Sequence, residues 1–167
     1  GDHHILSFTD GSRLAGRAVV LATGASYQRL GIPALEALVG AGVFYGGGVT
    51  EAQALEGQQV YVVGAGNSAG QAALYFSQHA AAVTIVHRGA DLRDSMSQYL
   101  VDRIEQASNI RVRLRTEVVA AHGEDALEAV TLRDCDTAEA PAVTTTDCVM
   151  SPTCSVAVTD TRDAGPT

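Results

Sequence analysis

Lysine is absent from this chain of 167 residues, and all eleven of its basic side chains are arginines. A protein without lysine cannot form a lysine Schiff base or use lysine as a general base. It also cannot hold a nucleotide with the lysine of a phosphate-binding loop. These three kinds of chemistry are therefore excluded.

Cysteine is scarce, and the positions of the three cysteines indicate neither a zinc site nor a redox site. Cys135, Cys148 and Cys154 all lie in the last fifth of the sequence, at spacings that match no zinc or redox motif. We interpret them as free thiols in a poorly packed tail. The His3-His4 pair has no carboxylate or thiolate at ligand spacing, so we expect two solvated histidines and no metal site.

Long apolar runs and an excess of positive charge are also missing. No run approaches the ~20 residues that cross a bilayer, and no signal peptide is visible. We therefore expect a cytoplasmic protein with no membrane partner. The formal net charge of −8 argues against a nucleic-acid partner.

The informative stretch covers residues 60–93. An apolar strand is followed by a glycine-rich turn, an amphipathic helix and a second apolar strand, which is the order of a dinucleotide-binding βαβ unit. Gly64 allows the tight turn, and Gly66 lets the backbone approach a pyrophosphate. Ala69 keeps the helix close to the sheet.

The start of the predicted helix completes the phosphate site. Ala65, Asn67, Ser68 and Ala69 lie where backbone N–H groups and the helix dipole face an anion. Asn67 or Ser68 is also expected to cap the helix. Capping alone is the alternative role for this turn.

Basic residues follow the second strand, where NAD enzymes usually carry an acidic residue that binds the ribose 2′-hydroxyl. His87 and Arg88 stand there, with Arg93 close behind. Such side chains attract a 2′-phosphate, so the sequence predicts that the chain binds NADPH. The alternatives are a surface histidine at position 87 and an Arg93 that pairs with Asp91 or Asp94.

The remaining pattern divides the chain into three parts. Residues 1–24 predict a β-hairpin, with a turn at Asp10-Gly11, followed by a buried strand over residues 17–22. Residues 25–45 carry the glycine and proline punctuation of a connecting loop. Residues 134–167 have few large aliphatic side chains, so we expect a disordered or loosely attached tail.

Further elements are expected after the βαβ unit. An apolar face predicts a helix, alternation predicts a half-exposed strand behind it, and two more short strands follow. These elements cover residues 95–107, 110–114, 117–120 and 127–133.

Two segments resemble one family of flavoproteins. Residues 17–25 with residues 30–33 resemble the Ala-Thr-Gly segment that ends a strand of the FAD domain, which implies that Thr23 and Gly24 contact flavin. Residues 62–73 with residues 87–93 resemble the NADPH domain of thioredoxin reductases. In that family the residues that match His87, Arg88 and Arg93 hold the 2′-phosphate, whereas Gly89 replaces a second arginine.

The resemblance implies an α/β fold, with a Rossmann-type three-layer NAD(P)-binding domain that has a β-meander, and a fragment of the FAD-binding domain. The expected parts are a partial FAD-domain hairpin, strand and hinge, then the NADPH domain, then a divergent tail. Their boundaries are residues 1–44, 45–134 and 135–167.

The chain also departs from that family. The Cys-x-x-Cys dithiol should lie at residues 45–50, which read Tyr-Gly-Gly-Gly-Val-Thr. A dithiol relay needs a thiolate to attack a disulfide, so disulfide reduction at this place is excluded. Tyr45 could lie near the nicotinamide or pack between domains.

The expected function is that of the NADPH-binding part of a flavoprotein oxidoreductase, which passes hydride from NADPH to FAD and then to an unknown electron acceptor. We assign no catalytic residue in this chain. The flavin fingerprint and the segment that completes the flavin site are not recognisable, so we expect a fragment that is inactive alone. The resemblance allows a homodimer of the intact protein. The alternative from another class is a non-catalytic NADP(H)-sensing or regulatory module.

Overall fold

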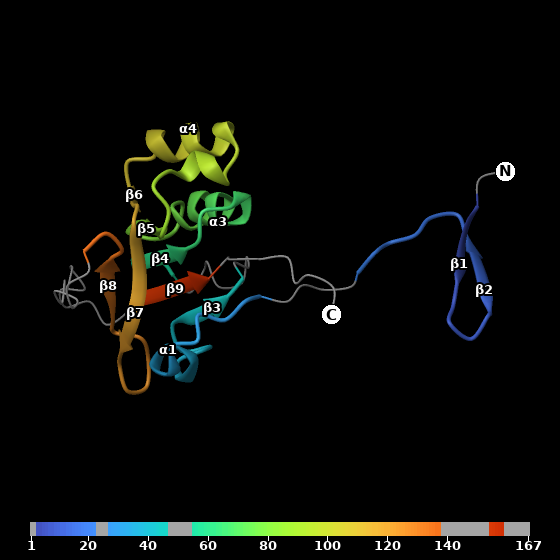
Figure 1. Cartoon of the computed structure of the whole chain (residues 1–167), viewed down its shortest axis with the longest axis horizontal. Coiled ribbons are helices and arrows are strands. Elements are labelled where there is room, and N and C mark those ends of the chain that lie inside the picture. Colours follow the sequence, from blue (N-terminus) through green and yellow to red (C-terminus); the bar gives the residue numbers. More distant parts are fainter. Residues whose placement is uncertain (1–2, 23–26, 47–54, 138–153, 159–167) are drawn as a thin grey trace.

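The computed structural model describes residues 3–22, 27–46, 55–137 and 154–158. Its main body is an α/β arrangement of three layers, and a short hairpin stands apart from it (Figure 1). Among the described residues, no helix is both long enough and apolar enough to cross a membrane.

The first two strands confirm the predicted hairpin. β1 (His4–Ser7) pairs antiparallel with β2 (Arg13–Gly16). Asp10 fixes the turn, because its carboxylate accepts hydrogen bonds from the backbone N–H and the hydroxyl of Ser12.

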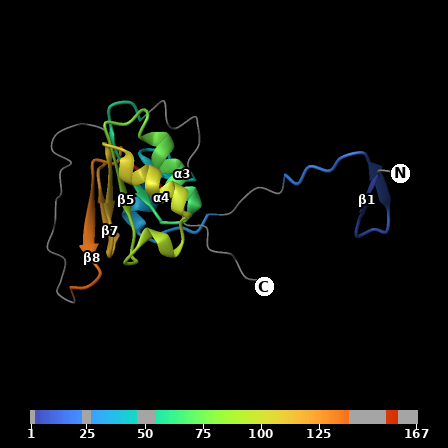
Figure 2. The ribbon, with the colours of Figure 1, turned by 90° about the horizontal axis from the view of Figure 1, so that it is seen from above.

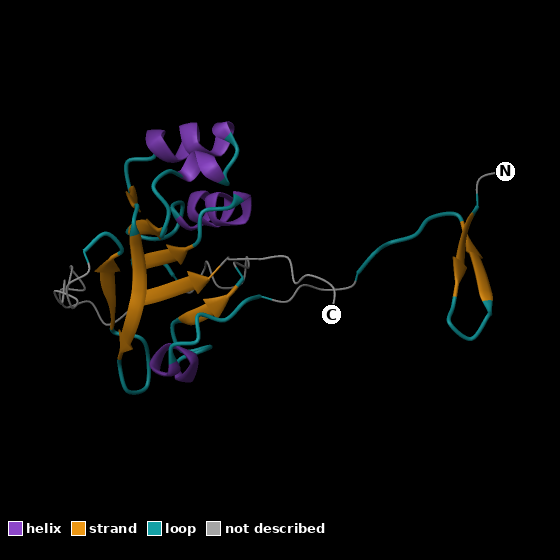
Figure 3. Cartoon of the chain, viewed as in Figure 1, coloured by secondary structure: helices purple, strands orange, loops and turns teal. Residues whose placement is uncertain are grey.

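The expected buried strand at residues 17–22 is wrong. These residues have no strand structure, and all six are exposed (Figure 3). An apolar run becomes a buried strand only when neighbouring strands bind its backbone groups and another layer covers it. No described strand pairs with this segment.

The centre of the body is a parallel sheet of five strands in the order β3-β9-β4-β5-β6. They are β3 (Val43–Tyr45), β9 (Cys154–Val158), β4 (Gln59–Val63), β5 (Ala82–Val86) and β6 (Ile110–Arg113). The expected strands within residues 60–63, 83–86 and 110–114 are thus confirmed.

β9 contradicts part of the expected tail. The segment Cys154–Val158 pairs in parallel with both β3 and β4, so it is an internal strand of the sheet. The prediction of a disordered or loose tail is therefore wrong for this segment, and the remaining residues after 137 lie outside the described part. The physical reason is that an internal strand gains hydrogen bonds and burial from two neighbours, and a local pattern does not reveal this gain.

Helices cover one face of the sheet. α3 (Asn67–Phe76) follows β4, and the short 3-10 helix η1 (Leu92–Asp94) and α4 (Gln98–Gln106) follow β5. Their buried side chains form a core with Val60 and Val62 of β4. Ala69 is fully buried there, as its predicted role at the helix–sheet contact requires.

A second layer covers the opposite face (Figure 2). It contains the antiparallel pair β7 (Thr116–His122) and β8 (Ala129–Asp134), with α1 (Pro33–Ala37) beside β7. Tyr61 and Val86 pack into this second core. Strand β4 therefore buries alternate side chains in the two cores, which explains the run of apolar side chains over residues 60–63.

Residues 25–45 are more structured than expected, because α1 and β3 both lie within the predicted loop. Both elements are short, at five and three residues. They depend on tertiary packing, as the full burial of Leu35 and Val43 shows.

Candidate nucleotide-binding site

The turn between β4 and α3 is open at the place where the pyrophosphate of a dinucleotide would lie. Gly64 has a φ of +125°, which disfavours any residue with a Cβ, and its N–H donates to the carbonyl of Val86 at 3.1 Å. Gly66 has an ordinary extended conformation, and a Cβ built there meets no atom within 4 Å. Neither conformation nor packing therefore requires glycine at position 66, whereas the predicted close approach of a phosphate would require it.

The start of α3 lacks the predicted side-chain cap. Gly66 is the N-cap, no side chain caps the helix, and the helix begins at Asn67. Asn67 instead accepts hydrogen bonds from the N–H and the hydroxyl of Ser97, at 2.8 and 3.0 Å. The expectation that Asn67 or Ser68 caps the helix is therefore wrong. With no side-chain cap at this helix start, the first amides of α3 can bind a ligand or water.

The same turn is also tied to the segment before α4. The Ser95 hydroxyl donates to the carbonyl of Ala65 at 2.9 Å. With the bonds between Asn67 and Ser97, this contact joins segments that are thirty residues apart in the sequence. The position of the glycine turn is thus fixed from two sides.

His87 and Arg88 follow β5, beside the glycine turn. The backbone of His87 is held on both sides, because its N–H donates to Arg113 and its carbonyl accepts from Thr116, each at 2.9 Å. A Cβ at Gly89 would lie 2.3 Å from Nε2 of His87. The imidazole therefore lies over Gly89, and any larger residue there would force the ring to turn.

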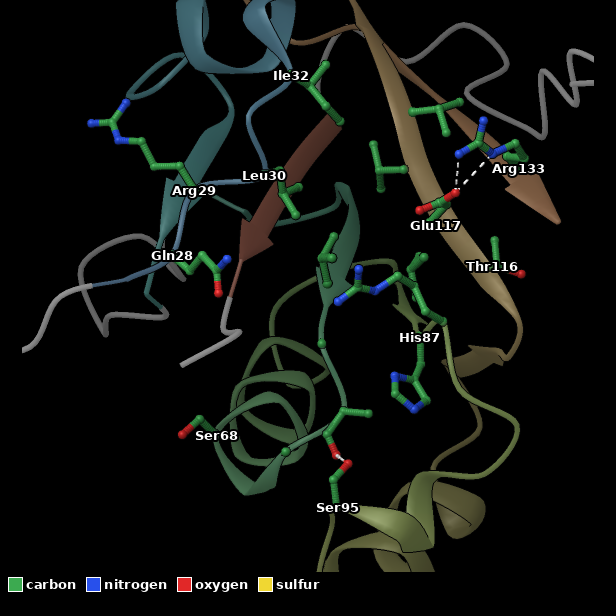
Figure 4. Close-up of a pocket in the computed structure, with 18 of the residues that line it drawn as sticks. Gln28, Arg29, Leu30, Ile32, Ser68, His87, Ser95, Thr116, Glu117 and Arg133 are labelled. Atoms are coloured by element: carbon green, nitrogen blue, oxygen red, sulfur yellow. Dashed lines mark hydrogen bonds and ion pairs between the residues drawn. The ribbon is translucent and has the colours of Figure 1, made fainter. Parts of the chain in front are cut away.

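These residues share one pocket of about 690 Å³. Figure 4 shows it between the start of α3, the end of β5 and the pair β7–β8. The structure brings together seven of the predicted cofactor-binding residues, although one other predicted residue, Ala69, lies behind the turn in the core. The seven are Gly64, Ala65, Gly66, Asn67, Ser68, His87 and Arg88.

Arg93 is placed differently. It is not among the residues that line the pocket, and its guanidinium bonds to Glu105 at 2.7 Å and lies 3.5 Å from Asp91. Pairing with an acidic neighbour was the alternative to phosphate binding. Asp91 is one of the two neighbours considered, and Glu105 on α4 was not anticipated. Thr23 and Gly24 lie outside the described residues.

Sequence reasoning missed two walls of the pocket. One is the linker before α1, and the other comes from β7 and β8. The missed residues include Gln28, Arg29, Leu30, Ile32, Thr116, Glu117, Val118, Val119 and Arg133. Within the second wall, Arg133 and Glu117 form an ion pair (Figure 4). No local motif marks these residues, because the fold brings them to the site from separate elements.

The charges of the pocket suit a dinucleotide phosphate. Its lining combines open helix amides, an imidazole and the Arg88 guanidinium, and α3 has no acidic residue in its first turn. Among the described lining residues the one glutamate, Glu117, is paired with Arg133. This donor set can bind an anion with several hydrogen bonds, and the open face at Gly66 gives the anion room.

The fold and this site define a dinucleotide-binding α/β protein of Rossmann type. The chain matches the family model of the pyridine nucleotide-disulphide oxidoreductases over residues 2–151. It belongs to that family.

The relatives it matches include thioredoxin reductases, whose family uses FAD and NADPH as cofactors. The chain is 34% identical to the enzyme of Streptomyces clavuligerus over 139 residues, which cover 83% of this chain and 42% of that protein. Identity to the enzyme of Mycoplasma genitalium is 32% over 131 residues, or 78% of this chain and 41% of that protein. The chain therefore spans less than half the length of either curated relative.

Solved structures agree. The thioredoxin reductase of Streptococcus pyogenes MGAS5005 superposes with a TM-score of 0.69 at 26% identity, over 96% of this chain and 49% of that chain. The thioredoxin reductase of T. acidophilum gives a TM-score of 0.70 at 20% identity, over 94% of this chain and 51% of that chain, which supports the fold alone.

Proposed function

We infer that this chain is the NADPH-binding part of a thioredoxin-reductase-like flavoprotein oxidoreductase. The observation that carries this proposal is the shared pocket, in which the open turn at Gly66 faces the same space as His87 and Arg88. The pyrophosphate of the cofactor binds at the turn and the first amides of α3. His87 and Arg88 then lie on the side where the adenosine ribose and its 2′-phosphate extend.

The part that this chain plays in the reaction is binding and orientation. The cofactor supplies a hydride for transfer to FAD in the intact protein. No side chain of the chain is assigned a proton-transfer role. Because residues 45–50 contain no cysteine, the acceptor beyond FAD is reached without a dithiol at this place, and its identity is open.

Substitution of the arginines tests the cofactor. The double variant Arg88→Ala, Arg93→Ala should lose several-fold to about a hundredfold in NADPH affinity, which corresponds to a total loss of roughly 1–3 kcal/mol in charge-assisted bonds. Its NADH affinity should hardly change. Arg111→Ala, on exposed β6, is the matched control and should affect neither. Equal losses for both cofactors would contradict the assignment of NADPH.

A spectrum separates the enzyme from a sensing module. The protein expressed with its full reading frame should be yellow, and NADPH should bleach the flavin bands. A colourless full-length protein that still binds NADPH would favour the non-catalytic NADP(H)-sensing module instead.

A further inference from the structure

The linker at residues 28–32 forms one wall of the pocket, and contacts from behind fix its position. Gln28, Leu30 and Ile32 line the pocket, while Tyr45 and Glu36 stand outside the lining and hold the linker backbone. The Tyr45 hydroxyl accepts from the N–H of Leu30 at 3.0 Å and donates to Oε1 of Glu36 at 2.5 Å.

Glu36 makes further bonds to the same segment. Its Oε2 accepts from Nη1 of Arg29 at 2.7 Å, and its Oε1 lies 3.4 Å from the N–H of Gly31. Arg29 also lies over the ring of Tyr45, with 5.6 Å between its Cζ and the ring centroid. One carboxylate and one hydroxyl therefore fix three consecutive linker residues.

A separate contact fixes the start of the linker. Gly46 has a φ of +91°, and a Cβ built there would lie 2.8 Å from Cζ of Tyr27. The Tyr27 ring therefore packs directly on the backbone at the end of β3. The linker is thus attached to β3 and α1 at several points and is a built wall of the pocket.

The strand order indicates which half of a dinucleotide this wall meets. His87 and Arg88 follow β5, which neighbours β4 on the side away from β9 and β3. The linker is attached at β3, on the other side of β4. In Figure 4, Gln28 and Leu30 lie across the pocket from Thr116 and Glu117. A ligand with its pyrophosphate at Gly66 and its adenosine at His87 turns its nicotinamide riboside toward the linker.

We propose that Tyr45 and Glu36 are positioning residues for the nicotinamide half of the cofactor, an inference that rests on the proposed NADPH function. They act through the linker, which presents the amide of Gln28 and the apolar side chains of Leu30 and Ile32 to the pyridine and its ribose. The adenosine half depends on the opposite side of the pocket and does not need them.

Two ligands separate this role from a general structural one. Calorimetric titration of the full chain compares NADPH with adenosine 2′,5′-bisphosphate, which lacks the nicotinamide half. Tyr45→Phe keeps the ring and removes the hydroxyl. It should weaken NADPH binding about three- to tenfold, as expected for the loss of one or two hydrogen bonds. Binding of the bisphosphate should stay within about twofold.

Two variants support the comparison. Glu36→Gln tests the other end of the contact and should give the same selective loss. Tyr99→Phe, on the exposed face of α4, is the matched control and should change neither affinity. Equal losses for both ligands in Tyr45→Phe and Glu36→Gln, or no loss for either, would overturn the inference while the proposed function stands. Failure of the unmodified chain to bind the bisphosphate would overturn both.

Discussion

Nη2 of Arg93 lies 2.7 Å from Oε1 of Glu105, so the arginine side chain is held against α4 and does not line the pocket. If Arg93 binds a 2′-phosphate, it must exchange this carboxylate for the ligand. The pair is exposed, with about half of each side chain accessible, so the exchange costs little. Glu105 therefore competes with the 2′-phosphate of the cofactor for the guanidinium of Arg93.

Glu105→Gln should raise NADPH affinity, because it removes the competing charge while keeping the shape of the side chain. The expected gain is roughly two- to fivefold, the range of an exposed ion pair. NADH affinity should not change. Asp102→Asn removes a charge from the same helix and controls for the general effect of net charge. If both variants strengthen NADPH binding equally, or if Glu105→Gln acts when Arg93 is already alanine, the prediction is wrong.

Gly64 and Gly66 should respond to alanine in different ways. Gly66→Ala should leave the free energy of unfolding nearly unchanged, since its conformation is ordinary and the space is open. It should weaken the binding of both NADPH and NADH roughly tenfold, because the methyl group separates the phosphate from the amides. Gly64→Ala forces a strained φ and should cost about 1–3 kcal/mol of stability. Urea unfolding and calorimetry measure the two effects, and a stability loss in Gly66→Ala would contradict the open-space explanation.

Asn67→Ala should destabilise the protein by about 1 kcal/mol, because it removes the acceptor for two hydrogen bonds from Ser97. Chemical denaturation measures the change. Ser68→Ala, at the next position, is the control and should have a smaller effect. An equally large loss of unfolding free energy in Ser68→Ala would show that the helix start, and not the contact with Ser97, determines the effect.

The stabilisation that Glu36 contributes to the folded protein should decrease at acid pH. Burial raises the pKa of Glu36, but the hydrogen bonds from Tyr45 and Arg29 outweigh it and hold the pKa below its ordinary value of 4.5. A lowered pKa in the folded state stabilises the protein above pH 4.5, and this stabilisation is lost as the pH falls through the lowered pKa. The difference in unfolding free energy between the unmodified chain and Glu36→Gln should therefore shrink below pH 4.5. A difference that stays constant with pH would refute this.

The βαβ unit could be predicted from sequence because its signals are local. β4 and β5 each contribute apolar side chains to both cores, α3 has one apolar stripe, and a glycine turn joins β4 to α3. The residues that this unit contributes to the pocket could therefore be predicted from the same local signals. The linker and the pair Glu117–Arg133 could not be predicted, since tertiary packing alone brings them there.

Errors arose where structure depends on distant partners. The apolar residues 17–22 predict a strand, yet no described strand lies beside them. The segment Cys154–Val158 carries no clear pattern, yet β3 and β4 flank it. For Arg93, whose phosphate-binding role stays a prediction, the ion-pair partner that was not anticipated, Glu105, lies twelve positions later. In each case the deciding contact is absent from the surrounding sequence.

β9 also has a consequence for biosynthesis. Of the described strands it is the last to leave the ribosome, yet it fills the gap between two that emerge much earlier. Until it is synthesised, β3 and β4 each present an unpaired edge to solvent or to chaperones. The sheet therefore closes only after β9 has been synthesised, through pairings of high contact order, and a nascent chain stalled before that point exposes a β-edge that can pair with other chains.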